Sequence, residues 1–467
     1  MLRARTARKP NSYGPRRDAV GPPEGRTARR LPSVASVSEQ ASDGRTGTRR
    51  SAKHGWVAAL VAVLAGLVAM MVTAALGLWA AGAAGLPGNS FPRVVAAVVV
   101  MAAGGSVELA GNAGELAQTH ADISVLPLSV TLAGALVIAA GFLRPLRHRA
   151  IASGGELLGW AGRVAVPWVV ALVVLSLLAR QDFAIPVTDP TGGIMEDVLD
   201  GAPKVGFRTN LPLTLLFGLL WLAGVMILAV LVSRGAPLPA RLVRFQESVR
   251  PAAYAMVALL LVYVALGVVI GLVVAATRGH APETFAVILL GLPNLVWFAY
   301  TIGLGASWEG KVDGPFGLPM PHILDAVLRT PDISTVDVST LAEQDGRIWW
   351  SIAVAAILTL AAAFGMALRS PARMRAWQHA LHMAVALVLT VLAICLLARV
   401  SAHYGLSLLG IGDIGGGLGG EVSLRPKVWS ALGLAVLWGL VTGFFGGLLA
   451  SRRHRRGAVE TSKPDRS

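Results

Sequence analysis

The stretch Ser176-Leu-Leu-Ala-Arg180 occurs a second time, almost unchanged, as Cys395-Leu-Leu-Ala-Arg399. Each copy closes an apolar run that is long enough to cross a membrane, because a bilayer core about 30 Å thick requires roughly 20 apolar residues in a helix. Thirteen residues downstream of Arg208 lies Trp221, and Trp438 follows Arg425 at the same spacing. Repeated features in the same order along an apolar chain predict a duplicated membrane fold.

The composition also indicates a membrane protein with basic ends. Of 467 residues, 54% are hydrophobic and 14% are charged, whereas a soluble domain carries roughly 25% charged residues. Most of the net charge of +15 lies in residues 1–54 and 452–467. These ends lack apolar periodicity, so we predict two disordered cytoplasmic tails held near anionic lipid headgroups. Nucleic acid is the alternative partner of such tails, and we do not expect it.

Eight apolar runs have the length of a membrane span. They are 56–82, 125–143, 160–179, 211–232, 253–276, 347–368, 379–398 and 428–450. Two further runs are irregular: 91–107 ends in Gly104-Gly105, and 284–306 carries Pro293-Asn294 near its middle. Both irregular runs are candidates for segments that enter the membrane without crossing it.

The distribution of charge predicts the topology. Arginine-rich loops follow the second, fourth and sixth runs, while the 181–210 and 307–346 loops are acidic. Basic loops favour the cytoplasm, and all of them are cytoplasmic only if 91–107 and 284–306 each enter and leave on the outer side. We therefore expect an all-α, multi-pass protein of the plasma membrane, with eight spans, two outer re-entrant or surface segments, and both termini in the cytoplasm.

This topology divides the membrane region into two repeats, 55–235 and 236–451. Both repeats begin inside, so we expect parallel four-helix repeats related by a pseudo-two-fold axis along the membrane normal. The outer loops echo each other as well, with Asp122-Ile-Ser124 before the second span of one repeat and Asp332-Ile-Ser334 before that of the other.

Polar residues gather at the two irregular outer regions. Backbone that is not helical at membrane depth must be shielded by protein or face water, so we hypothesise that the two regions face each other around a polar vestibule. The alternative is an extracellular cap that only packs the helices. The candidate vestibule residues are Glu108, Asn112, Asp122, Asn294, Glu309 and Asp332.

Other motifs predict no catalytic, cofactor or metal site. His379 and His382 share a helical spacing that metal ligands use, but no acid or cysteine accompanies them, so an interfacial pair is the simpler interpretation. The glycines of 415–420 match G-x-G-x-x-G without the strand and helix that a dinucleotide site requires. The single cysteine, Cys395, lies in an apolar run and predicts an inert small hydrophobe. We do not expect an enzyme.

Three strings of the chain are similar to the streptophobe family, very hydrophobic integral membrane proteins of streptomycetes. They are Leu126-Pro-Leu-Ser-Val-Thr-Leu-Ala-Gly-Ala-Leu136 with the Gly141-Phe-Leu-Arg-Pro-Leu-Arg147 that follows it, Leu292-Pro-Asn-Leu-Val-Trp297 and Gly314-Pro-Phe-Gly-Leu318. The resemblance covers roughly residues 55–455 and implies a membrane location. It implies no activity and no site residues.

Two functions follow from these features. The first is a transport or channel-like bundle with a pocket between the repeats. The second is an envelope anchor or scaffold that uses the basic tails and the acidic outer loops. A polar, hydrated cavity between the repeats would favour transport, and a dry interface would favour the anchor. The substrate or protein partner is not specified by the sequence.

Overall fold

The computed structural model describes residues 34–460 with short gaps. The gaps are 87–89, 113–116, 147–153, 185–203, 234–239, 313–323, 325–326, 330–332, 372–373, 409–410 and 414–419, and for parts of the strands and of the two terminal helices only the backbone is described. The chain divides into two units after Lys53. The first unit contributes the helical residues from Val34 onward, and all that follows concerns the second, His54–Ser467.

Seven helices of the described chain are long and apolar enough to cross a membrane, which confirms a predominantly helical, multi-pass membrane protein. They are α1 (Val34–Ala80), α4 (Gly154–Leu178), α6 (Leu211–Val232), α7 (Ala240–Arg278), α12 (Trp350–Arg369), α13 (Ala376–Leu397) and α14 (Val428–Glu460). Two of them, α1 and α14, continue into the segments predicted to be disordered tails.

The predicted span at 125–143 is a shorter helix, α3 (Leu128–Leu143), of 16 residues. At 1.5 Å per residue it is about 24 Å long, less than the thickness of a bilayer core. Pro127 precedes it and provides no side-chain cap. The N-terminus of α3 therefore requires hydrogen-bond partners from elsewhere in the protein.

The two irregular runs form short helices. The first is α2 (Phe91–Ala102), and the second is a pair, α8 (Ala281–Leu290) and α9 (Leu292–Gly303), bent by 78° at Gly291. The bend has a local cause, because Pro293 lies in the first turn of α9, where its missing N–H is tolerated, and cannot continue α8. By length and composition the pair is one broken span or a re-entrant loop.

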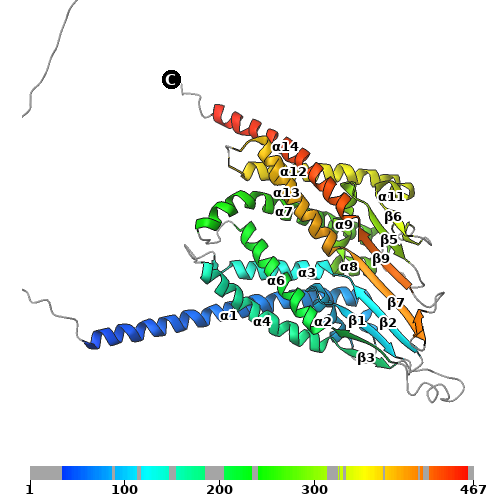
Figure 1. Ribbon diagram of the computed structural model, residues 1–467, viewed down its shortest axis with the longest axis horizontal. Coiled ribbons are helices and arrows are strands. Elements are labelled where there is room, and N and C mark those ends of the chain that lie inside the picture. Colours follow the sequence, from blue (N-terminus) through cyan, green and yellow to red (C-terminus); the bar gives the residue numbers. More distant parts are fainter. Residues whose placement is uncertain are drawn as a thin grey trace, which may run out of the picture. The chain divides into compact units, whose positions relative to one another are not determined.

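A nine-stranded antiparallel sheet joins segments that the sequence assigned only to loops and irregular outer segments. Its strands are β1 (Val107–Asn112), β2 (Ala117–Ser124), β3 (Gln181–Ala184), β4 (Lys204–Thr209), β5 (Trp308–Val312), β6 (Ser334–Val336), β7 (Val400–Leu408), β8 (Ile411–Asp413) and β9 (Gly420–Pro426). All of them gather at one end of the helices (Figure 1). The chain segments that carry these strands therefore lie at one end of the helices, while the side of the membrane on which they lie stays a prediction.

Each half of the second unit has its own hydrophobic core. Trp168, Phe142 and their neighbours form the core of the first half, and Tyr300, Trp308 and their neighbours form that of the second. Three residues cross this division: Leu128 of α3 belongs to the second core, Leu126 packs against that core, and Leu290 of α8 packs against the first. The halves thus interlock where α3 meets the bent pair.

The short helices α2 and α9 end in the same turn. Gly104 and Gly305 have φ angles of 94° and 91°, a conformation that favours glycine. The N–H of Gly104 donates to Met101 O and that of Gly105 to Val100 O; in the second half Gly305 donates to Ile302 O and Ala306 to Thr301 O. Both ends are therefore Schellman motifs, each leading directly into a strand.

The strand register relates the two halves residue by residue. Glu108 lies opposite Arg208, and Glu309 lies opposite Arg425. The two arginines, each thirteen residues before a tryptophan, therefore occupy corresponding positions in the strands of the two halves. The Asp-Ile-Ser echo is out of register. Asp122 lies opposite Glu108, whereas the residue opposite Glu309 is Thr335.

The sheet also shows how the halves are joined. Its order is β3-β4-β1-β2-β7-β9-β5-β6, with β8 beside β7, so two four-strand sections of equivalent order follow one another head to tail. A two-fold axis at the junction would place equivalent strands there. The junction instead pairs β2 with β7, the counterpart of β3, so no two-fold axis passes through the junction itself, and the axis expected along the membrane normal stays a prediction.

Candidate functional site: a pocket between the two halves

Asn294, in the first turn of α9, connects the second half to the backbone of the first. Its Nδ2 donates to Leu126 O at 2.9 Å, and its Oδ1 accepts from Leu128 N at 3.2 Å. Leu128 is the first residue of α3, where backbone N–H groups have no partner inside the helix. Asn294 therefore supplies the cap that α3 lacks, from a position 166 residues away.

A second hydrogen bond crosses the same junction in the opposite direction. Ser129 Oγ donates to Ile288 O at 2.8 Å. Ile288 lies in the last turn of α8, where the bend at Gly291 leaves carbonyl groups without helical donors. Each half thus satisfies backbone groups that a helix end in the other half leaves open. These contacts hold α3 against the bent pair α8–α9.

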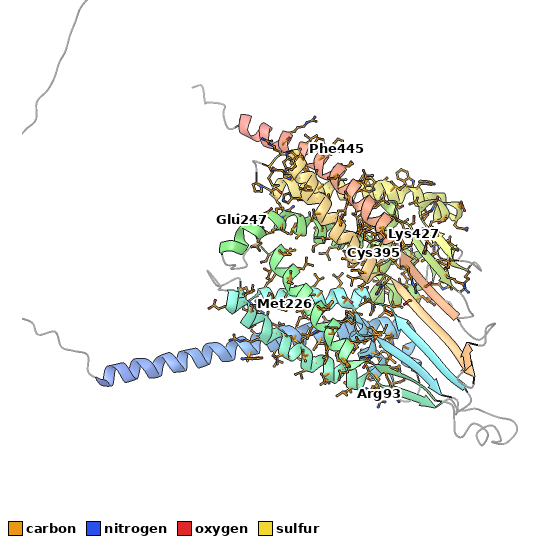
Figure 2. All side chains as sticks on the ribbon, viewed as in Figure 1. Arg93, Met226, Glu247, Cys395, Lys427 and Phe445 are labelled. Carbon is orange, nitrogen blue, oxygen red and sulfur yellow. The ribbon has the colours of Figure 1, made fainter. Side chains whose placement is uncertain are left out.

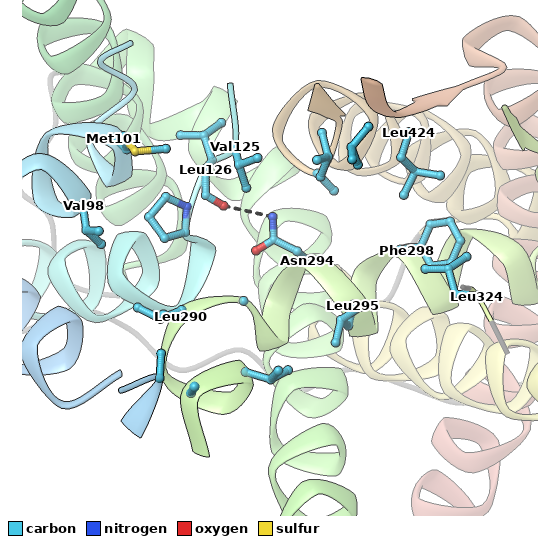
Figure 3. Close-up of a pocket in the computed structure, with 18 of the residues that line it drawn as sticks. Val98, Met101, Val125, Leu126, Leu290, Asn294, Leu295, Phe298, Leu324 and Leu424 are labelled. Carbon is cyan, nitrogen blue, oxygen red and sulfur yellow. Dashed lines mark hydrogen bonds between the residues drawn. The ribbon is translucent and has the colours of Figure 1, made fainter. Parts of the chain in front are cut away.

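Beside these contacts lies a half-open cavity of about 360 Å³. Figure 3 shows Val98 and Met101 of the first half on one side and Phe298 and Leu424 of the second half on the other, with Leu126 and Asn294 between them. Strand residues Val400, Val422 and Leu424 complete the wall toward the sheet. The cavity is therefore formed by both halves and lies where the helices meet the strands.

The wall of this cavity is apolar. Among the described residues that line it, only Asn294 and Ser423 have polar side chains, and none is charged. Both polar groups of Asn294 are already bonded to backbone of the other half. A bare ion or a strongly hydrated solute would lose its water here without compensation, whereas an uncharged hydrocarbon chain would not. The volume falls within the range of about 300–1,000 Å³ typical of ligand pockets.

The predicted vestibule residues lie in separate places. Glu108 and Asp122 face each other in register on β1 and β2, and Asn112 ends β1 opposite Gln118. Glu309 lies on β5 and forms an ion pair of 3.3 Å with Lys427. Four strand spacings separate β1 from β5, about 19 Å. Asp332 lies outside the described residues, and of the two predicted residues whose side chains are described, Asn294 and Glu309, only Asn294 lines the cavity.

The remaining sequence candidates do not form a site in the described chain. His382 contacts Ser248 Oγ at 3.2 Å and the Gln378 carbonyl at 2.7 Å, while His379 is buried. No cluster of three metal-ligating side chains occurs among the described residues. Cys395 is buried in the core of the second half, and residues 415–419 of the glycine-rich loop lie in a gap of the description.

One sequence feature could have pointed to the lining residues that we did not predict. Leu126-Pro127 and Leu292-Pro293 are two Leu-Pro steps in apolar surroundings, one at the start of each helix that meets at the cavity. Proline marks helix starts, but it does not say that two such starts lie together. Comparison with protein-family models, with curated proteins and with solved structures finds no match to this chain.

Proposed function

We propose that this membrane protein binds the apolar chain of a lipid-like molecule in the pocket between its two halves, as a transport-type bundle whose cargo is hydrophobic. The observation that carries the proposal is the composition of the pocket, which has an apolar wall contributed by both halves and no charged lining residue among those described. The predicted polar vestibule for a hydrated solute receives no support from this wall. Duplication, cytoplasmic termini and a plasma-membrane location belong to the same proposal.

The position of the pocket supports a lipid rather than a soluble ligand. The pocket is lined by the short apolar helices α2, α8 and α9, and its wall includes Ala81 and Ala398, which directly follow two candidate spans. A hydrocarbon chain entering from the bilayer would therefore meet apolar side chains. The half-open wall permits this exchange, and the strands limit the pocket on one side. Transfer of an acyl or isoprenoid chain into such a site requires no desolvation of charge.

Retention of lipid by the purified full-length chain tests this proposal. Leu295 lines the pocket, and Leu295→Trp should fill it and reduce the amount of dioleoyl phosphatidylglycerol that survives delipidation, measured by native mass spectrometry, by at least about tenfold. The matched control is Leu272→Trp, because Leu272 is exposed on α7 outside the pocket. Equal retention by both variants and the unmodified chain would show that the pocket does not hold the lipid.

A second function, that of an envelope scaffold, is favoured by the sheet. Strands from both halves form one continuous sheet at one end of the helices (Figure 1), and we infer that this sheet could serve as a docking platform. Reconstituted vesicles distinguish the two functions. Movement of a fluorescent acyl lipid between leaflets that is lost in Leu295→Trp supports the transport-type bundle, and its absence in the unmodified protein supports the scaffold.

A further inference from the structure

A second cavity, of about 280 Å³, lies between α7 and α12. Its residues come from the ends of two candidate spans, Gln246–Arg278 and Gly346–Arg369. Glu247 marks this region, at the end of the helices away from the strands and from Lys427 (Figure 2). The cavity is therefore at the level of the membrane interface, on the side opposite the sheet.

Two arginines line this cavity, Arg250 from α7 and Arg369 from α12. Within the described chain, neither arginine forms an ion pair with a carboxylate, whereas Lys427 pairs with Glu309. A guanidinium has five N–H donors, and Arg369 uses one for the Gly365 carbonyl at 3.1 Å. Several charged donors thus remain available in one pocket.

Arg369 is held in place before any ligand arrives. Its guanidinium carbon lies 4.5 Å from the centre of the Tyr254 ring, a cation–π distance. Ser370 Oγ donates to Met366 O at 2.9 Å at the end of α12, and Pro251 and Pro371 form stiff parts of the wall. A fixed guanidinium loses less conformational entropy on binding an anion than a mobile one.

The charge of the wall matches one particular ligand. Arg250, Arg369 and Glu247 together carry +1, which a single phosphodiester neutralises. We propose that this cavity binds the phosphodiester of a membrane phospholipid headgroup, with both guanidinium groups donating to its oxygens. Glu247 then lies where a headgroup ammonium finds an acceptor. This site is independent of the apolar pocket and of the basic tails.

Binding of short-chain lipids to the purified full-length chain tests the proposal. The probes are dihexanoyl phosphatidylglycerol, dihexanoyl phosphatidylethanolamine and inorganic phosphate. The double variant Arg250→Gln/Arg369→Gln should weaken binding of both lipids by at least about tenfold, because charged hydrogen bonds are lost. Arg278→Gln, at the opposite end of α7, is the matched control and should bind like the unmodified chain.

Two further variants protect this test from a folding artefact. Arg369→Lys keeps the charge but loses the planar, forked donor set, so it should bind with intermediate affinity and an unchanged melting temperature. Glu247→Gln should lower the preference for phosphatidylethanolamine over phosphatidylglycerol. Unchanged lipid binding in the double variant, or displacement of lipid by inorganic phosphate at equal concentration, would overturn the headgroup site. Leu295→Trp should leave this binding intact.

Discussion

The inner and outer edges of the two sheet sections differ in length. At the junction, β2 has 8 residues and β7 has 9, whereas their counterparts at the ends of the sheet, β6 and β3, have 3 and 4. An unpaired strand edge invites association with other chains, and short edge strands reduce that risk. The two halves have the same order of strands in the sheet. The strand that lies at the junction is long in each half, and its counterpart at the open end of the sheet is short.

The helices show a second difference between the halves. The turn at Gly104 makes α2 the counterpart of α9, and α8 has no long counterpart in the first half, where a short 3₁₀ helix, Ala83–Gly85, follows α1. The additional helix carries Leu290 and Ile288, which contact the first half. The asymmetric element is thus the one that joins the halves and lines the pocket between them.

Proline in the sheet should produce the largest difference between inner and outer edges. Ala121→Pro on β2, which pairs with both β1 and β7, should cost about 3 kcal/mol or more, because proline removes a donor from a central ladder. Thr335→Pro on β6, which has one described neighbour, should cost clearly less. Thermal unfolding in detergent measures both, and equal losses would contradict the difference between the edges.

Removal of the cap that crosses the halves should have the next largest effect. Asn294→Ala leaves Leu128 N–H and Leu126 C=O without their partner, at a cost of about 2–3 kcal/mol. Asn294→Asp retains the acceptor for Leu128 N–H and should recover part of the loss. An unfolding midpoint of Asn294→Ala equal to that of the unmodified chain would show that the junction does not depend on this side chain.

The paired glycine turns allow the same substitution in both halves. Gly104→Ala and Gly305→Ala should each cost roughly 1–2 kcal/mol for a left-handed residue with a side chain. Gly104→Ala should be the worse, because its added methyl would lie 3.1 Å from Phe217 Cβ, against 3.8 Å from Leu434 for Gly305. Chemical unfolding of the two variants measures the difference, and a larger loss at Gly305 would contradict the packing.

The smallest effect should come from an element that only the second half has. The short helix α11 (Val338–Gln344) begins with a capping box in which Asp337 accepts from Thr340 N at 3.0 Å. Burial raises the pKa of Asp337, but hydrogen bonds from Ser339 and Thr340 together lower the pKa by a larger amount. The pKa of Asp337 therefore lies below its usual value. The stabilisation is therefore present above the unfolded pKa of 3.8 and is lost as the pH falls below it.

Asp337→Ala should cost about 1 kcal/mol at neutral pH, whereas Asp337→Asn should keep the cap and remove its pH dependence. Hydrogen exchange of the Thr340 amide between pH 3 and 6 is the measurement. The first half continues from β2 to α3 through residues 125–127 without such a helix, so its amides serve as the internal reference. Identical pH profiles in the Asp337→Asn variant and the unmodified chain would contradict the assignment.

Local sequence was sufficient for the helices. Seven spans could be predicted because a helix in lipid must present apolar side chains over its whole length, and the break near Pro293 could be predicted because proline cannot continue a helix. Short stretches of sequence were also sufficient to predict the membrane class and the two irregular segments. The correspondence of Arg208 with Arg425 could be predicted because each arginine has the same spacing to a nearby tryptophan. The streptophobe resemblance stays a prediction.

The sheet and the pocket depend on contacts between distant residues. Strands such as β2 and β7 pair over almost 300 positions, and no alternation within either strand specifies that partner. Asn294 was predicted as a vestibule residue from its polarity and its place in the irregular 284–306 segment, but its two hydrogen bonds to the first half make it a cap. A pocket between the halves was predicted, but its apolar lining was not, because its wall combines residues from Ala81 to Leu424.

By itself, the sequence determined that this protein is a predominantly helical, multi-pass membrane protein, because each position of a helix in lipid must carry an apolar side chain. Only the tertiary structure decided that the two halves join through one sheet and share the wall of a half-open apolar pocket. The hydrogen bonds that join β2 to β7 connect backbone groups, which every residue carries, so the sequence does not identify the partner strand. In the same way, the backbone groups at the start of α3 that Asn294 binds have no mark in the sequence.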